Sequence, residues 1–208
     1  MLSHVKMLFG LVGSIVVLGA IVGIASANRL STSSRNIRAT WAFLHNEAGG
    51  GTAPGCPVTL EGSLHSATIA KVIEALVGFI SRATVNSNGC GAGSATLLQE
   101  SLPWHVRYKG FAGALPNITS INTAIIGWSW RYQEGGFGIT CLARSTATEP
   151  LLLTLNRNVT TRALTSADVG GQINANCGGE ALFPLRFSGR SSSLTLLGAT
   201  TAITVTLI

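Results

Sequence analysis

The stretch LPWHVRYKGFAGALPNITSINTAIIGWSWRY, residues 102–132, indicates most about the fold. Apolar and polar side chains alternate along its first half, where Trp104, Val106 and Tyr108 share one face. A second alternating run begins after Pro116, and its shared apolar face holds Ala124, Ile126, Trp128, Trp130 and Tyr132. Alternation with a period of two is typical of strands that bury one face. The stretch therefore predicts two long antiparallel strands joined by a short loop.

The same alternation recurs along most of the chain. It is clear in segments 37–43 and 58–64, and again in the C-terminal segment 203–207. Glycine and proline clusters separate these segments and mark turns. About ten to twelve short strands with such turn signals predict an all-β fold, an antiparallel sandwich or barrel. We assign them to a single β domain at residues 36–208, preceded by a flexible Ser/Thr-rich segment at residues 28–35.

Residues 66–86 fit two patterns. Apolar residues from Ile69 to Leu76 recur at the spacing of an amphipathic helix, and Ser66 is a suitable N-cap. From residue 77 onward the side chains alternate as they do in a strand. The sequence therefore predicts at most one short helix, near residues 67–76, followed by a strand.

The N-terminus has the features of an export signal. Residues 7–24 are apolar or small without interruption, and Ala25-Ser26-Ala27 matches the small-x-small pattern of a signal-peptidase site. We therefore expect residues 1–27 to be a signal peptide and the mature protein to be secreted or at the cell surface. The alternative is a retained N-terminal anchor helix, because such a run reaches the lower length limit for spanning a bilayer.

Four cysteines follow the predicted signal peptide: Cys56, Cys90, Cys141 and Cys177. An even number of cysteines in an exported chain favours disulfides, and four cysteines allow three pairings. We predict the pairs Cys56–Cys90 and Cys141–Cys177, because each pair encloses a self-contained stretch of similar length. No C-x-x-C spacing typical of a zinc site is present, so we predict no metal and no cofactor.

The charge is mildly basic. The chain carries 14 Lys and Arg against 8 Asp and Glu, a formal net charge of +6. Nucleic-acid-binding proteins cluster their cations along one face or arm, whereas these are scattered from Arg29 to Arg190, so we expect no nucleic-acid partner. A basic surface suits acidic envelope polymers or glycans. Membrane contact is expected only through a retained N-terminal segment.

Four aromatic residues are the candidate ligand-binding residues: Trp104, Trp128, Trp130 and Tyr132. A row of aromatic side chains on one strand face can form a flat platform for a sugar ring or a lipid. The alternative is that these side chains fill the core, where aromatic residues contribute large buried areas. The solvent exposure of Trp128 and Trp130 distinguishes the two interpretations: a platform requires both to be exposed, and a core requires both to be buried.

The sequence indicates no catalytic site. The histidines of the mature part, His45, His65 and His105, lack the H-x-x-x-H spacing of a metal site. Asp168 is the only aspartate, no G-x-S-x-G motif is present, and the seven glutamates occur singly. A hydrolase would need two carboxylates, or a serine and a histidine, brought together from distant segments.

Three stretches carry a resemblance to known proteins: CPVTLEGSLHSATIAKV at 56–72, LPWHVRYKGFAGALPNITSI at 102–121 and FGITCLAR at 137–144. They resemble secreted β-rich proteins of unassigned function from actinobacteria. The resemblance implies an exported bacterial protein and carries over no catalytic or binding residue.

These features together predict a secreted, disulfide-stabilised, non-enzymatic protein of the cell envelope or of surface interactions. The alternative is a carbohydrate- or lipid-binding β-module that uses the aromatic strand face. A secreted hydrolase is the third hypothesis.

Overall fold

The computed structural model describes residues 29–48, 51–52, 55–91, 93–133, 138–179 and 182–208. The predicted signal peptide or anchor at residues 1–27 lies outside the described residues. Within them the secondary structure is almost entirely β, with two single-turn 3-10 helices, η2 (Ser87–Gly89) and η3 (Gln99–Ser101). The all-β prediction is confirmed. The described part of the chain contains no helix with the length and apolar character needed to cross a bilayer.

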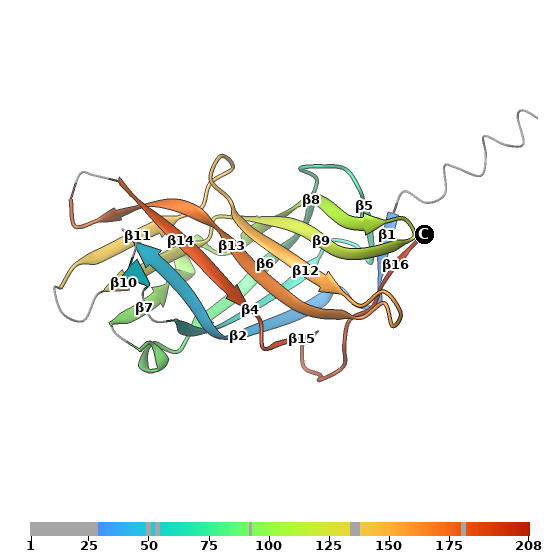
Figure 1. Cartoon of the computed structure of the whole chain (residues 1–208), viewed down its shortest axis with the longest axis horizontal. Helices are drawn as coiled ribbons and strands as arrows, with labels where there is room; N and C mark the ends of the chain where they lie inside the picture. The colour runs from blue at the N-terminus through green and yellow to red at the C-terminus, as the bar shows by residue number, and fades with distance from the viewer. Residues whose placement is uncertain (1–28, 49–50, 53–54, 92, 134–137, 180–181) are drawn as a thin grey trace, which may run out of the picture.

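Eight antiparallel strands form a closed ring (Figure 1). They follow one another around the ring in chain order, and the last strand pairs with the first. The strands of the ring are β2 (Asn36–Ala48), β4 (Cys56–Leu64), β6 (Leu76–Val85), β8 (Trp104–Ala114), β9 (Asn117–Ile126), β12 (Leu151–Arg157), β13 (Leu164–Cys177) and β14 (Leu182–Arg190). Of the two predicted architectures, the structure is the barrel.

Shorter strands extend the barrel at both ends (Figure 1). At one end β7 (Ser94–Leu97), β10 (Ser129–Gln133) and β11 (Thr140–Arg144) continue the sheet from β13. At the other end β1 (Arg29–Thr32), β5 (Thr68–Ala70) and β16 (Val205–Leu207) form a separate three-stranded sheet. Two further strands, β3 (Gly51–Thr52) and β15 (Ser193–Leu196), pair with β2. We call the end that carries the three-stranded sheet the terminal end, because the described chain begins and finishes there.

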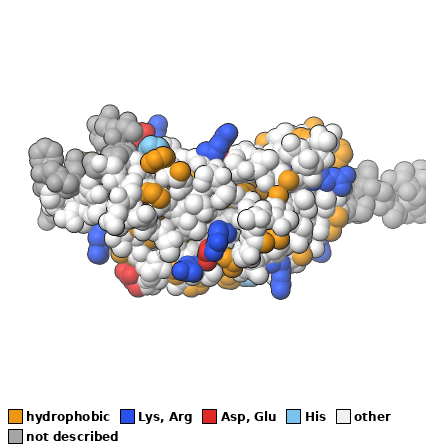
Figure 2. Space-filling model, turned by 90° about the horizontal axis from the view of Figure 1, so that it is seen from below, with side chains coloured by type: hydrophobic (Ala, Val, Ile, Leu, Met, Phe, Trp, Pro, Cys, Tyr) orange, Lys and Arg blue, Asp and Glu red, His pale blue; other side chains and the backbone are white. Residues whose placement is uncertain are grey.

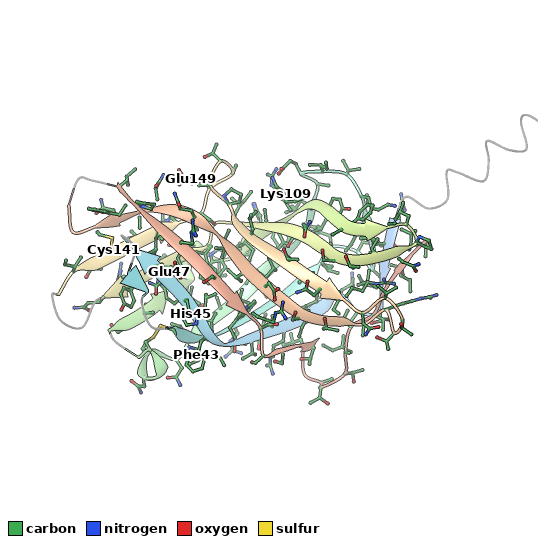
Figure 3. All side chains as sticks on the ribbon, in the orientation of Figure 1. Phe43, His45, Glu47, Lys109, Cys141 and Glu149 are labelled. Carbon is green, nitrogen blue, oxygen red and sulfur yellow. A yellow bond between two sulfur atoms is a disulfide. The ribbon has the colours of Figure 1, made fainter. Side chains whose placement is uncertain are left out.

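Both predicted disulfides are present. Cys56, at the start of β4, is bonded to Cys90, and Cys141 of β11 is bonded to Cys177 of β13. Cys141 and Cys177 are direct partners in the strand register. Figure 3 shows Cys141 far from the terminal end. We call this opposite end, with β7, β10 and β11, the disulfide end.

The predicted alternation of side chains holds along β8 but is interrupted in the second run. Between β9 and β10, Gly127 has a φ of 95°, a conformation that side chains other than glycine rarely adopt. The interruption shifts the pattern by one residue. Ile125 packs in the core before it, where an unbroken pattern predicts Ala124, and Trp128 and Trp130 pack in the core after it.

Two local segments differ from the sequence-based expectation. Residues 29–32 of the expected flexible segment form β1, because Leu30 is fully buried and the strand pairs with both β5 and β16. Residues 67–76 hold β5 and a turn instead of a helix. Of the apolar residues at helical spacing, Ile69 is buried, whereas Val72 and Ile73 are 61% and 66% exposed. A helix would have no continuous apolar partner here.

Candidate functional site

An apolar cavity of about 70 Å³ lies inside the barrel, toward the terminal end. Its wall combines ring strands with the three-stranded sheet, which contributes Thr32 of β1, Ile69 of β5 and Val205 of β16. The described residues that line it include no Lys, Arg, Asp, Glu or His. We call this space the barrel cavity.

Small residues at inward positions leave this space open. Ala39 of β2 and Ala167 of β13 are buried and line the cavity. Gly62 and Gly78 line it where β4 and β6 come close together, and a Cβ at either position would lie 2.3 or 2.4 Å from a backbone oxygen of the other strand. Larger side chains are therefore excluded at this part of the wall.

Two polar donors at the cavity lack a hydrogen-bond partner. The hydroxyls of Thr32 and Thr123 donate to backbone carbonyls at 3.3 and 2.9 Å. By contrast, Trp41 Nε1 and the Tyr108 hydroxyl, both from side chains at most 2% exposed, have no partner among the described residues. A buried donor left unpaired costs about 1–3 kcal/mol. The two side chains come from different parts of the cavity wall, Trp41 from β2 and Tyr108 from β8.

Burial also affects the ionisation of the Tyr108 phenol. It raises the pKa of the Tyr108 phenol above its ordinary value of 10.0. The phenol is therefore neutral and able to donate a hydrogen bond at any physiological pH. The barrel cavity thus has an almost entirely apolar surface, with two unpaired donors in the side chains of its wall and no formal charge.

Arg157, the last residue of β12, is a buried charged residue next to the cavity wall. Its guanidinium is buried and donates from Nε to the Val205 carbonyl at 2.8 Å and from Nη1 to the Ile118 carbonyl at 2.7 Å. Burial, and then the positive charge of Arg162, lower the pKa of Arg157. The contacts join β12 to β16 and β9, so Arg157 holds the cavity wall at Val205 in place.

Comparison with protein-family models, curated proteins and solved structures gives no match. One fold can carry many unrelated functions, so the function has to be argued from the geometry of the site.

The four aromatic residues predicted to bind a ligand lie inside the other half of the barrel. Trp104, Trp128 and Trp130 are fully buried, and Tyr132 is 7% exposed. The ring centroids of Trp104 and Trp128 are 5.0 Å apart, and those of Trp128 and Trp130 are 5.9 Å apart. Because they are buried, they do not form the exposed platform that binding at the outer face requires. Their positions agree with the alternative interpretation, that they fill the core.

Sequence reasoning missed a buried polar group beside these tryptophans. Asn46 of β2 is fully buried, and neither atom of its amide has a hydrogen-bond partner among the described residues. Asn46 is the register partner of Phe187, whose ring packs edge-on against Trp128 and Trp130 at 5.9 and 6.0 Å. The indole nitrogens of Trp128 and Trp130 are also unpaired in the described part of the chain. An unbroken alternation from Trp41 predicts Asn46 on the outer face; the register shift between Trp41 and Leu44 turns it inward, and no sequence signal shows that shift.

The structure does not assemble a catalytic group from the residues it describes. His65 and His105 are exposed on the outer face and flank Phe79, at 4.5 and 5.3 Å between ring centroids. Carboxylates are held singly: Glu61 pairs with Arg38 at 2.6 Å, and Asp168 pairs with Arg190 at 3.1 Å. No three His, Cys, Asp or Glu side chains in the described residues come together as a metal site would require. The barrel cavity is therefore the best candidate for a functional site.

Proposed function

We propose that this chain is an exported, non-enzymatic protein that binds a small apolar ligand inside its barrel. The barrel cavity with its two unpaired donors is the observation that carries the proposal. Barrels of eight strands are just wide enough either to be filled by side chains or to hold one small ligand. The half of this barrel next to the terminal end leaves part of its interior unfilled. In this proposal the lipid binds inside the barrel and not on an aromatic strand face.

The cavity restricts the chemistry of the ligand. An engineered apolar cavity of about 150 Å³ binds benzene, and the barrel cavity, at about 70 Å³, is roughly half that size. It suits a short alkyl group or the tip of a longer acyl or isoprenoid chain. A charged group is disfavoured because no opposite charge lines the wall, whereas a single carbonyl or hydroxyl oxygen could accept a hydrogen bond from Tyr108 or Trp41.

Export is supported by the cysteines and by the N-terminal sequence. All four cysteines are in disulfides, which persist in oxidising compartments outside the cytoplasm. The apolar run at residues 7–24 and the Ala25-Ser26-Ala27 triplet fit a signal peptide, and the resemblance to secreted actinobacterial proteins fits a bacterial envelope. The ligand would then be taken up at or near the cell surface.

The proposal is tested by thermal unfolding in the presence of straight-chain alcohols from butanol to decanol. A ligand that binds only the folded state raises the melting temperature, and at about 100 times Kd it adds about 2.7 kcal/mol to the free energy of unfolding. Each added methylene should strengthen binding by about 0.8 kcal/mol until the cavity is full, after which the gain stops. The chain length at which the gain stops measures the usable depth.

Cavity-filling variants are the matched control. Ala39→Leu and Ala167→Val place added carbons in the barrel cavity and should abolish the response, whereas Ala143→Leu, in the core of the other half, should retain it. The proposal fails if no alcohol raises the melting temperature of the parent chain, or if the filled variants respond as the parent does.

A further inference from the structure

The loop between β5 and β6 presents two neighbouring apolar side chains to solvent. Val72 and Ile73 are 61% and 66% exposed. Isolated exposed apolar residues are common on protein surfaces, whereas contiguous apolar surface is typical of contact sites. On the face that Figure 2 shows, hydrophobic side chains and Lys or Arg side chains lie dispersed among other side chains.

This loop is held firmly in its exposed position. Glu74 has a φ of 67°, which is unusual for a residue other than glycine. It is fixed by an ion pair with Lys109 of β8 and by a hydrogen bond from its backbone N–H to the Tyr108 carbonyl at 2.8 Å. The Tyr108 N–H in turn donates to the Ala75 carbonyl at 3.0 Å. Strained backbone persists only where its surroundings determine it, and it is concentrated at functional positions.

The charges in the connections of the terminal end are predominantly positive. Arg29 is the register partner of Ala70, so it lies across the sheet from the residue that precedes Lys71. Arg35 and Arg162 lie in other connections at the terminal end. Glu74 is the only acidic residue in the described connections of this end, and it is paired with Lys109. Lys71 lies 5.6 Å from the centroid of the Phe111 ring, beside the exposed pair.

We infer that the terminal end docks on an anionic lipid surface, with Val72 and Ile73 inserted among the acyl chains and the neighbouring cations on the headgroups. Interfacial binding scales with buried apolar area and with attraction to anionic lipids, and this end supplies both. The inference goes beyond ligand binding in the cavity and does not depend on it.

Docking would bring the membrane next to the barrel cavity. Ile69, just before the loop, and Val77, just after it, both line the cavity. The Tyr108 side chain lines the cavity too, while its backbone holds the loop. A lipid surface at the terminal end would therefore supply apolar ligands at the wall of the cavity.

The test is co-sedimentation of residues 29–208 with vesicles. This part contains every described strand, both disulfides and the buried core, so it is the folding unit, and it omits the N-terminal apolar segment that would bind vesicles by itself. Two kinds of vesicle are compared. One is phosphatidylcholine with about 30% phosphatidylglycerol, which gives the vesicle surface a negative potential, and the other is pure phosphatidylcholine. We expect binding to the anionic vesicles that is at least about tenfold tighter and that weakens with salt.

Three variants separate the contributions. Val72→Ser/Ile73→Ser should weaken binding to anionic vesicles about tenfold or more, because it removes the inserted apolar groups. Arg29→Gln/Lys71→Gln should remove the preference for anionic over neutral vesicles. Leu182→Ser, at a side chain 65% exposed at the disulfide end, is the matched control and should bind as the parent does.

Three results would overturn the inference. The first is equal binding of the parent to anionic and neutral vesicles, or none to either. The second is loss of binding in Leu182→Ser but not in Val72→Ser/Ile73→Ser. The third is self-association of the parent in solution that disappears in Val72→Ser/Ile73→Ser, which would assign the loop to contact with a second copy. Unchanged melting temperatures show that each variant is folded.

Discussion

The two halves of the barrel use the same eight-strand ring in opposite ways. Toward the disulfide end the interior is filled by stacked aromatic rings, with Trp128 in contact with Trp104, Trp130 and Phe187. Toward the terminal end the interior positions carry mainly aliphatic and small side chains beside Trp41 and Tyr108, and the barrel cavity remains. Both disulfides lie in the filled half. One half is therefore cross-linked and filled by aromatic rings, whereas the other half leaves part of its interior empty.

The largest expected effect comes from removing a disulfide of the filled half. Loss of Cys141–Cys177 in the Cys141→Ala/Cys177→Ala variant should lower the free energy of unfolding by about 4 kcal/mol, because the cross-link restrains a long loop of the unfolded chain. The closed loop spans a sequence separation of 36 residues. Urea unfolding measures the change. If the two halves are independent, the double variant should still gain melting temperature in the presence of alcohols. A fall in the free energy of unfolding of less than about 1 kcal/mol would show that the disulfide contributes little to the stability of this end.

The same substitution placed in each half gives the sharpest contrast. Ala143→Leu adds three carbons to the packed half, where Ala143 is fully buried, and should cost about 1–3 kcal/mol through overpacking. Ala39→Leu adds them beside the barrel cavity and should leave stability within about 1 kcal/mol of the parent or raise it. Urea unfolding of the two variants side by side checks this. Equal costs would show that the two interiors are packed alike.

Asn46→Leu tests the unpaired amide of the filled half. Because neither amide atom of Asn46 has a partner in the described part of the chain, an apolar side chain of similar size should raise the free energy of unfolding by about 1–2 kcal/mol. Thermal unfolding measures the gain, with Asn46→Ala as the control that removes the amide but leaves a void. A loss of stability in Asn46→Leu would instead indicate that an ordered water satisfies the amide.

The smallest effect is expected for Tyr108→Phe at the barrel cavity. Well below pH 10 the phenol is protonated in both the folded and the unfolded chain, so the variant differs from the parent by loss of an unpaired hydroxyl and should be more stable by about 1 kcal/mol. Burial raises the pKa of Tyr108 in the folded chain, so above pH 10 the unfolded chain loses this proton first and parent stability falls as pH rises. Urea unfolding at pH 8 and pH 10.5 should show a smaller fall for Tyr108→Phe. Equal falls would mean that the phenol ionises as easily in the folded chain.

Alternation and spacing predicted the architecture because each depends on local sequence. The period-two pattern at Trp104, Val106 and Tyr108 fixed β8, and the similar loop lengths between cysteines gave the correct pairing. The sequence could not distinguish a barrel from a sandwich, because the difference depends on whether β14 pairs with β2, a strand more than a hundred residues earlier in the chain. The break at Gly127 was missed because a glycine in an alternating run does not reveal its φ.

The candidate site was less predictable than the fold. Sequence placed Tyr108 on a buried face, but a cavity arises only from the summed volumes of side chains on distant strands. The aromatic residues were the visible signal, and they belong to the filled half. The exposed pair Val72 and Ile73 fits helical spacing but lies in a turn, because spacing alone does not tell whether apolar residues meet a partner.

The pairing of β1 with β16 determines how the molecule responds to mechanical load. Arg29 and Ile208 exchange backbone hydrogen bonds in both directions, at 3.1 and 3.0 Å, and the two strands are antiparallel. A force applied between Arg29 and Ile208 would therefore break the hydrogen bonds of this pair one after another. The force would reach the eight-strand ring only after β1 and β16 had separated.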